Sequence, residues 1–206
     1  MPFPTTNATK ELPAINQILS SCGQAPVTTL DQTNPDVAIA YDTLLQVSRE
    51  VQAEGWTFNK EYHYEFTPDT NDEILIPNNI LQIKLTENSG NLDKDGVRRN
   101  GKLYDRHNHT YDWTDETVEC DVVWEFDWVD LPQPIQDFIV ARAATFVSQR
   151  IIGDQNQYQM LQQQEAYMRA LALEYETQQG QFTFFGHPQG HTNYYQSYQP
   201  FHALSR

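Results

Sequence analysis

Apolar side chains recur at every second position from Val118 to Trp128, and acidic side chains occupy most of the positions between them. Successive side chains of an extended strand point to opposite faces, so this period of two separates the two kinds of residue. The segment predicts a half-buried strand with a core face and an acidic face. The core face holds Val118, Cys120, Val122, Trp124, Phe126 and Trp128, and the acidic face holds Glu119, Asp121, Glu125 and Asp127.

Two helical patterns precede this strand. Pro13 fits the first position of a short helix over residues 14–21, and Gly23 is placed to end it. Asn34 is a favourable N-cap for a second helix, which Gly55 would end. The apolar stripe of this second helix consists of Val37, Tyr41, Leu44, Leu45 and Val51.

Two further helices are expected after the strand. Pro132 and Pro134 open the first of them, and its apolar residues keep a helical spacing up to Gly153. The last helix is expected over about residues 155–177. Its stripe of Leu161, Met168, Leu171 and Tyr175 needs a partner helix to cover it.

The region between the helices has the features of β structure. Aromatic residues alternate with polar ones from Tyr62 to Phe66, which predicts a second half-buried strand. Asn100 and Gly101 both tolerate a positive φ angle and therefore favour a tight turn between two strands.

These elements predict an α+β fold. Residues 1–55 and 130–179 would form a four-helix bundle, and residues 56–129 would form a β-rich insertion between its two halves. Residues 180–206 would form an extended C-terminal arm.

The C-terminal segment differs in composition from the rest of the chain. It contains no Asp or Glu, although the whole chain has 28 of them, and it shows neither a helical nor a strand period. Composition alone leaves two interpretations open, a disordered tail and an arm whose aromatic side chains dock on a partner. The aromatic residues concerned are Phe182, Phe184, Phe185, Tyr194, Tyr195, Tyr198 and Phe201.

The formal net charge of −15 disfavours a protein that grips nucleic acid or an anionic membrane. The N-terminus lacks the features of a secretory leader, and no stretch approaches the roughly 20 apolar residues of a membrane span. We therefore expect a soluble protein made in the cytoplasm. Cys22 and Cys120 show no metal-site spacing and suit a reducing compartment, but a disulfide between them remains an alternative.

Several motifs have the residue types of a metal site. Asn91, Asp93, Asp95 and Gly96 match the first half of a calcium loop, but position twelve is Lys102 where a bidentate Glu is needed. We interpret this run as a polar turn. The pairs His107/His109 and His187/His191 have spacings compatible with metal ligation, yet no third ligand lies nearby, so solvated histidines are preferred. No cofactor or metal is expected.

The row of carboxylates along the predicted strand has two interpretations. Two of them would supply the acid and base of a glycosidase if they faced a sugar at the right separation. Alternation on a strand produces such a row without any catalytic role, so a solvated face or the wall of a channel is preferred. Sequence motifs of nucleophile-elbow hydrolases, P-loop proteins and zincins do not occur. We therefore expect no enzyme activity.

Segments spread over most of the chain resemble the tail tubular protein A family of short-tailed bacteriophages, the podoviruses. In that family a first helix ends in a Gly-x-x-Pro-Val turn and a second ends in Gly-Trp-x-Phe-Asn, and both are present here. The matching segments are Gly23 to Val27, Gly55 to Asn59, RRNGKLYDR at 98–106, FIVARAATFVSQRIIG at 138–153 and QEAYMRALALEYE at 164–176. Trp56 and Phe58 would anchor the insertion on the bundle.

The resemblance implies a structural virion protein of the phage tail that is assembled in the host cytoplasm. Twelve copies would form a ring-shaped adaptor, or connector, between the portal and a nozzle protein of the tail tubular protein B type, with tail fibres attached nearby. DNA would be ejected through the lumen without specific binding, and no membrane would be involved. The C-terminal arm would then dock on the portal. A carbohydrate-active virion protein that degrades host surface polysaccharide is the alternative function.

Overall fold

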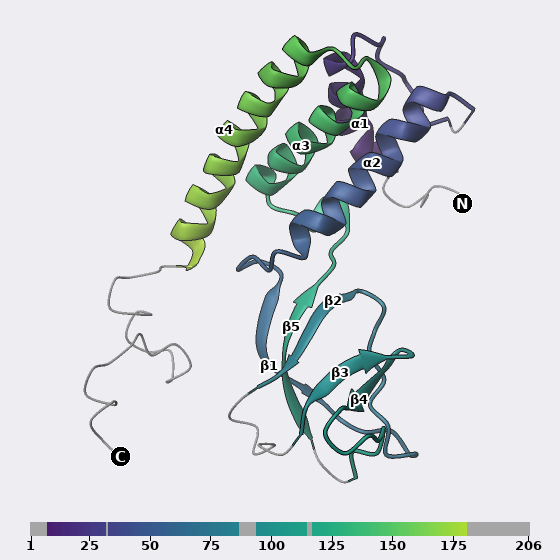
Figure 1. Ribbon diagram of the computed structural model, residues 1–206, viewed down its shortest axis with the longest axis vertical. Coiled ribbons are helices and arrows are strands. Elements are labelled where there is room, and N and C mark those ends of the chain that lie inside the picture. The colour runs from purple at the N-terminus through teal and green to yellow at the C-terminus, as the bar shows by residue number, and fades with distance from the viewer. Residues whose placement is uncertain (1–7, 32, 87–93, 115–116, 181–206) are drawn as a thin grey trace.

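The computed structural model describes residues 8–31, 33–86, 94–114 and 117–180. Figure 1 shows an elongated molecule with its helices gathered at one end and its strands at the other. The fold is mixed α+β, as predicted. In chain order the helices are α1 (Ala8–Ser21), α2 (Pro35–Gln52), the short 3-10 helix η1 (Trp128–Asp130), α3 (Gln133–Ile151) and α4 (Gln155–Gly180).

Helix α3 is the centre of the helical end, because α1, α2 and α4 all pack against it. Small side chains such as Ala143 and Ala144 let these neighbours approach closely, while Phe138 and Ile139 fill the space between them. Helix α4 lies along the outer side of α3, away from α2 (Figure 1). The helical core therefore surrounds α3, and α4 closes only one side of it.

The first helix begins at Ala8, so the predicted start at Pro13 was wrong. Pro13 is exposed inside α1, where its missing N–H removes one hydrogen bond near the beginning of the helix. Glu11 lies before Pro13 and is only 3% exposed. Packing of this earlier turn against the core extends the helix back past the proline.

Helix α2 has the predicted N-cap residue and the predicted glycine after its C-terminal end. The side chain of Asn34 caps it by accepting a hydrogen bond from the Asp36 N–H at 3.0 Å. The helix ends at Gln52, and Gly55 takes a φ of 78° just beyond it. Leu45 was wrongly placed in the buried stripe, since it faces solvent and is 38% exposed.

The strands form a three-stranded antiparallel sheet in the order β1-β5-β2 and a separate β3-β4 hairpin. The predicted tight turn joins the hairpin, with φ angles of 53° at Asn100 and 73° at Gly101. Trp113 is fully buried under the hairpin and donates from Nε1 to the Leu103 carbonyl at 2.9 Å. The strands are β1 (Lys60–Phe66), β2 (Ile80–Leu85), β3 (Gly96–Arg99), β4 (Lys102–Asp105) and β5 (Val118–Trp124).

The alternation predicted for the first strand is broken by a β-bulge. In the register of β1 on β5, Glu61 pairs with Val122 and Tyr64 pairs with Cys120, so β1 carries one extra residue. His63 lies in the bulge and has a φ of 56°. As a result Tyr62 and Tyr64 are about 40% exposed and only Phe66 is buried, contrary to the prediction.

The last predicted strand is shorter than its sequence pattern. Strand β5 ends at Trp124, and its buried residues Val118, Cys120 and Val122 belong to the core of the sheet. Beyond the strand, Phe126 and Trp128 pack into the helical core instead. The alternating pattern thus runs across two cores, and the prediction of one continuous strand to Trp128 was wrong.

The two cysteines are free thiols, each buried in a different core. The disulfide alternative is therefore wrong. Burial raises the pKa of the Cys22 thiol, and burial together with the nearby Asp121 carboxylate raises that of Cys120 to about 12. Both side chains act as small apolar residues of their cores.

Candidate interaction surfaces

Buried amide side chains join the helical end to the sheet. The Asn59 side chain donates to the carbonyls of Gln52 and Trp124, both at 2.8 Å, and accepts from the Trp56 N–H at 2.8 Å. The Gln52 side chain accepts from the Phe126 N–H at 2.7 Å and donates to its carbonyl at 3.1 Å. These bonds connect the end of α2, the residues before β1 and the residues after β5. The two segments by which the chain enters and leaves the sheet are therefore held together at one place.

Aromatic packing completes the junction. Trp56 is buried, as predicted, and donates from Nε1 to the Val51 carbonyl at 2.7 Å. Phe58 is only half-buried and lies beside Phe126, with 6.3 Å between the ring centroids. The junction therefore combines apolar burial with fully satisfied polar groups.

Helix α4 is also tied to this junction by residues of its C-terminal half. The Glu176 carboxylate accepts from the Thr57 N–H at 2.9 Å and from the Thr57 hydroxyl at 2.8 Å. Arg169 pairs with Glu54 at 3.2 Å. These contacts fix the direction of α4 relative to the sheet, although its side chains contribute little to the core.

Helix α4 leaves most of its apolar side chains uncovered. It has 26 residues, of which only Ala172 is fully buried. Leu161, Met168 and Tyr175 of the predicted stripe are half-buried, and Leu171 is 38% exposed. Met160, Tyr167 and Leu173 are exposed as well. Such a surface on one long helix is typical of a site that another polypeptide covers.

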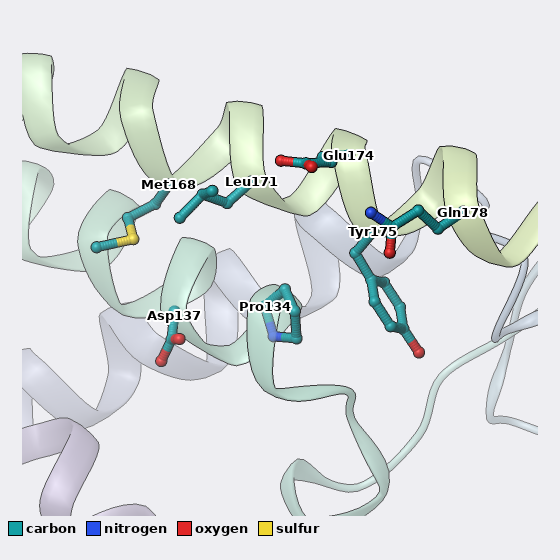
Figure 2. Close-up of a pocket in the computed structure, with 7 residues that line it drawn as sticks. All are labelled: Pro134, Asp137, Met168, Leu171, Glu174, Tyr175 and Gln178. Carbon is teal, nitrogen blue, oxygen red and sulfur yellow. The ribbon is translucent and has the colours of Figure 1, made fainter.

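A groove of about 280 Å³ runs between this helix and the start of α3. Figure 2 shows Met168, Leu171 and Tyr175 on the side of α4 that faces α3, with Pro134 of α3 below them. Two carboxylates, Asp137 and Glu174, lie at its edges. The groove is therefore apolar along its length and acidic at its rim. Gln178 completes the lining.

A larger cleft of about 930 Å³ lies where α2 faces the segment after β5. The Glu11 carboxyl lines it beside Tyr41 and is almost completely buried. Burial raises the pKa of Glu11, the Tyr41 hydroxyl lowers it by hydrogen bonding, and the Asp127 carboxylate raises it. An acid in this environment favours its protonated form.

The acidic row does not form one continuous face. Glu119 and Asp121 lie on β5, whereas Glu125 and Asp127 follow it. Glu119 contacts the His63 ring at 2.7 Å, and Asp121 accepts from the Thr86 hydroxyl at 3.1 Å. Glu125 pairs with Arg49 at 3.1 Å. Glu119 and Asp121 are thus held by side chains of the sheet, whereas Glu125 and Asp127 line the larger cleft beside α2.

The other candidate residues lie apart from these surfaces. His107 and His109 are exposed after β4. Asp95 precedes β3, Gly96 is its first residue, and Asn91 and Asp93 of the calcium-like run lie outside the described residues. His187, His191 and all seven aromatic residues of the predicted arm also lie outside them, while Gly180 belongs to α4. In the described ranges no group of three His, Cys, Asp or Glu could hold a metal ion.

The comparison with protein families matches residues 12–182 to the family of tail tubular proteins. The match covers both helical segments, the sheet and the junction between them. The chain belongs to the tail tubular protein family. This tail tubular protein is similar to tail tubular protein A of Klebsiella phage KP34, with 27% identity over 164 residues, which are 80% of this chain and 85% of the relative.

The resemblance drawn from the sequence motifs is thereby confirmed. The protein is a structural component of a phage tail. None of the helices in the described part of this tail tubular protein is both long enough and apolar enough to span a bilayer.

Proposed function

We propose that the protein is a ring-forming adaptor that connects the portal of a podovirus to its tail nozzle. Twelve copies surround a channel through which DNA is ejected, and tail fibres attach to the outside of the ring. The observation that carries the proposal is the uncovered apolar face of α4, which a single copy leaves in solvent. Membership of a tail protein family supplies the setting.

The charge of the chain supports a passive channel. Each copy carries a formal charge of −15, so a ring of twelve has a charge of about −180. Such a surface repels the phosphates of DNA, so the DNA passes through the channel without binding to it. We infer that the lumen offers DNA no specific contacts, and that the ring is completed in the host cytoplasm without a membrane.

The presence of two cores supports different roles for the helical part and the β-rich part of the chain. Residues 1–55 and 130–179 act as a four-helix bundle that packs laterally against neighbouring copies. Residues 56–129 form a β-rich insertion, which offers the surfaces for the nozzle and the fibres. The Gln52 and Asn59 hydrogen bonds hold these two parts in a fixed relation, as a load-transmitting ring requires.

The C-terminal arm is the proposed docking element for the portal. Its composition, rich in aromatic residues and free of Asp and Glu, suits burial against a partner surface. Each aromatic residue offers on the order of 150 to 250 Å² for burial, and repetition around a ring adds avidity. The contact residues are Phe182, Phe184, Phe185, Tyr194, Tyr195, Tyr198 and Phe201.

A deletion of residues 181–206 tests the docking role. Because the deletion keeps every described residue of α4, the shortened chain should keep the helical circular dichroism of the full chain. It should fail to co-sediment with portal rings. Co-sedimentation at the level of the full chain would contradict the docking role, and loss of the helical signal would show that the arm belongs to the core.

Within the acidic row, Glu119 and Asp121 contact His63 and Thr86 on the sheet. Glu125 and Asp127 line the larger cleft, where Glu125 is paired with Arg49 at 3.1 Å. The carbohydrate-active alternative therefore gains no support from the geometry of the sheet.

A further inference from the structure

We propose that the groove between α3 and the C-terminal half of α4 is the resting site of the chain's own residues 181–206 before the chain meets a partner. The groove is the one in Figure 2, lined by Pro134, Asp137, Met168, Leu171, Glu174, Tyr175 and Gln178. The inference goes beyond portal docking, because it concerns the protein before assembly.

The position of the arm along the chain favours this occupant. Helix α4 ends at Gly180, and Gln178 already lines the groove. The groove extends along α4 from Met168 to Gln178, a distance of about 15 Å at 1.5 Å per residue. An extended segment spans about 3.3 Å per residue, so roughly five residues cover this length after the chain reverses. The arm has 26 residues and therefore reaches every part of the groove.

The short tether also favours the arm of the same chain over that of another copy. A segment joined by a few residues is present at an effective concentration on the order of millimolar. Free copies reach such a concentration only in very concentrated solution. The arm of the same molecule therefore occupies the groove first.

The chemistry of the groove matches that of the arm. Met168, Leu171 and Pro134 offer apolar contacts to aromatic rings, and the Met168 sulfur adds a favourable contact with a ring edge. At the rim, Asp137 and Glu174 would repel an acidic segment. The arm contains no acidic residue, whereas it has three histidines and Arg206. Its charge is therefore suited to this rim.

The same aromatic residues would leave the groove to bind the portal. One side chain cannot fill the groove and contact the portal at once, so the two states compete. A chain in the resting state hides its aromatic side chains and part of the α4 face. This arrangement would limit association of free copies in solution.

Hydrogen exchange of the full chain, followed by mass spectrometry in dilute solution without portal, tests the resting site. Amides of residues 181–206 should exchange about tenfold or more slowly than those of a synthetic peptide of the same sequence. The variant Leu171→Glu places a charge in the groove and should abolish this protection. Leu173→Glu is the matched control, because Leu173 is exposed on the same helix but does not line the groove.

Protection of α2 and α3 in each variant shows that the fold is kept. If Leu171→Glu disturbs α4, Asp137→Lys on α3 reverses a rim charge instead and should weaken the protection. Three results would overturn the proposal: exchange of the arm as fast as in the free peptide, equal loss of protection in both leucine variants, or protection that increases with protein concentration. The last would assign the groove to the arm of a second copy. Portal binding plays no part in this measurement, so its outcome is independent of the adaptor role.

Discussion

Asn59 forms three side-chain hydrogen bonds where the helical end of the molecule meets the sheet. It is completely buried, and its side chain bonds to backbone groups of α2, of the corner before β1 and of the end of β5. A buried amide with all its bonds made is stabilising, whereas its removal leaves several backbone groups without partners.

We expect Asn59→Ala to destabilise the protein by about 2 to 4 kcal/mol, because the Trp56 N–H and the carbonyls of Gln52 and Trp124 lose its side chain. Urea unfolding measures the change. Asn156→Ala removes an exposed asparagine and should alter stability by less than about 0.5 kcal/mol. Equal midpoints for the two variants would show that Asn59 does not hold the junction.

Glu11 predicts a pH dependence of stability. Its pKa is raised by burial and by Asp127, and the Tyr41 hydroxyl opposes the shift only in part. Below its ordinary pKa of 4.5, both the folded and the unfolded chain hold the proton. Above that value the unfolded chain loses it first, so the contribution of Glu11 to stability falls as the pH rises through the pKa of the folded state.

Glu11→Gln keeps the shape of the side chain and removes this ionisation. The variant should therefore gain stability relative to the parent as the pH is raised from 5 to 8. Unfolding midpoints at several pH values measure the difference between the two proteins. A difference that stays constant over this range would contradict a raised pKa at Glu11.

Single residues also show where sequence reasoning succeeds. Asn34, Gly55 and the Asn100-Gly101 turn behave as predicted, because caps and tight turns depend on adjacent residues. The role of Gln52 was missed. Its side chain forms hydrogen bonds with the backbone of Phe126, 74 residues away. No local sequence pattern predicts a buried amide of this kind.

At the scale of elements, α4 is the helix whose stability depends least on the core. Its one fully buried side chain is Ala172, which faces α3. The sequence correctly placed Met168, Leu171 and Tyr175 on one stripe, but it could not show that α3 covers this stripe only in part. The groove arises from that incomplete cover, which is a tertiary property.

Ala172→Leu should overpack the α3–α4 contact and destabilise the protein by about 1 to 3 kcal/mol. Ala170→Leu, at an exposed position of the same helix, should change stability by less than about 0.5 kcal/mol. Thermal unfolding of both variants distinguishes the positions. A similar melting temperature for the two would mean that α4 does not pack against α3 at Ala172.

Two strands depart from their sequence patterns for reasons that lie outside the strands. The bulge at His63 depends on the pairing of β1 with β5, and His63 there contacts Glu119. Strand β5 ends where its chain leaves the sheet for the helical core, although the alternation continues to Trp128. A period of two predicts which side chains are buried, but it does not predict in which of the two cores they are buried.

At the scale of the whole molecule, the order of elements predicted the architecture better than their boundaries. Helical patterns on both sides of a β-rich segment correctly predicted a mixed α+β fold in which the strands lie between the helices along the chain. The surfaces used in assembly could not be located in this way. They depend on which side of α4 remains uncovered, and all seven aromatic residues of the predicted docking arm lie in residues 181–206, outside the described part of the chain.

Native mass spectrometry of the protein mixed with portal rings tests the adaptor role most directly. Each copy has a mass of 23.9 kDa, so a complete ring should add about 290 kDa to the portal in a single dominant species. Images of the same sample should show one added ring with an open channel. Portal rings that stay unmodified, or that carry scattered single copies without a closed ring, would contradict the account.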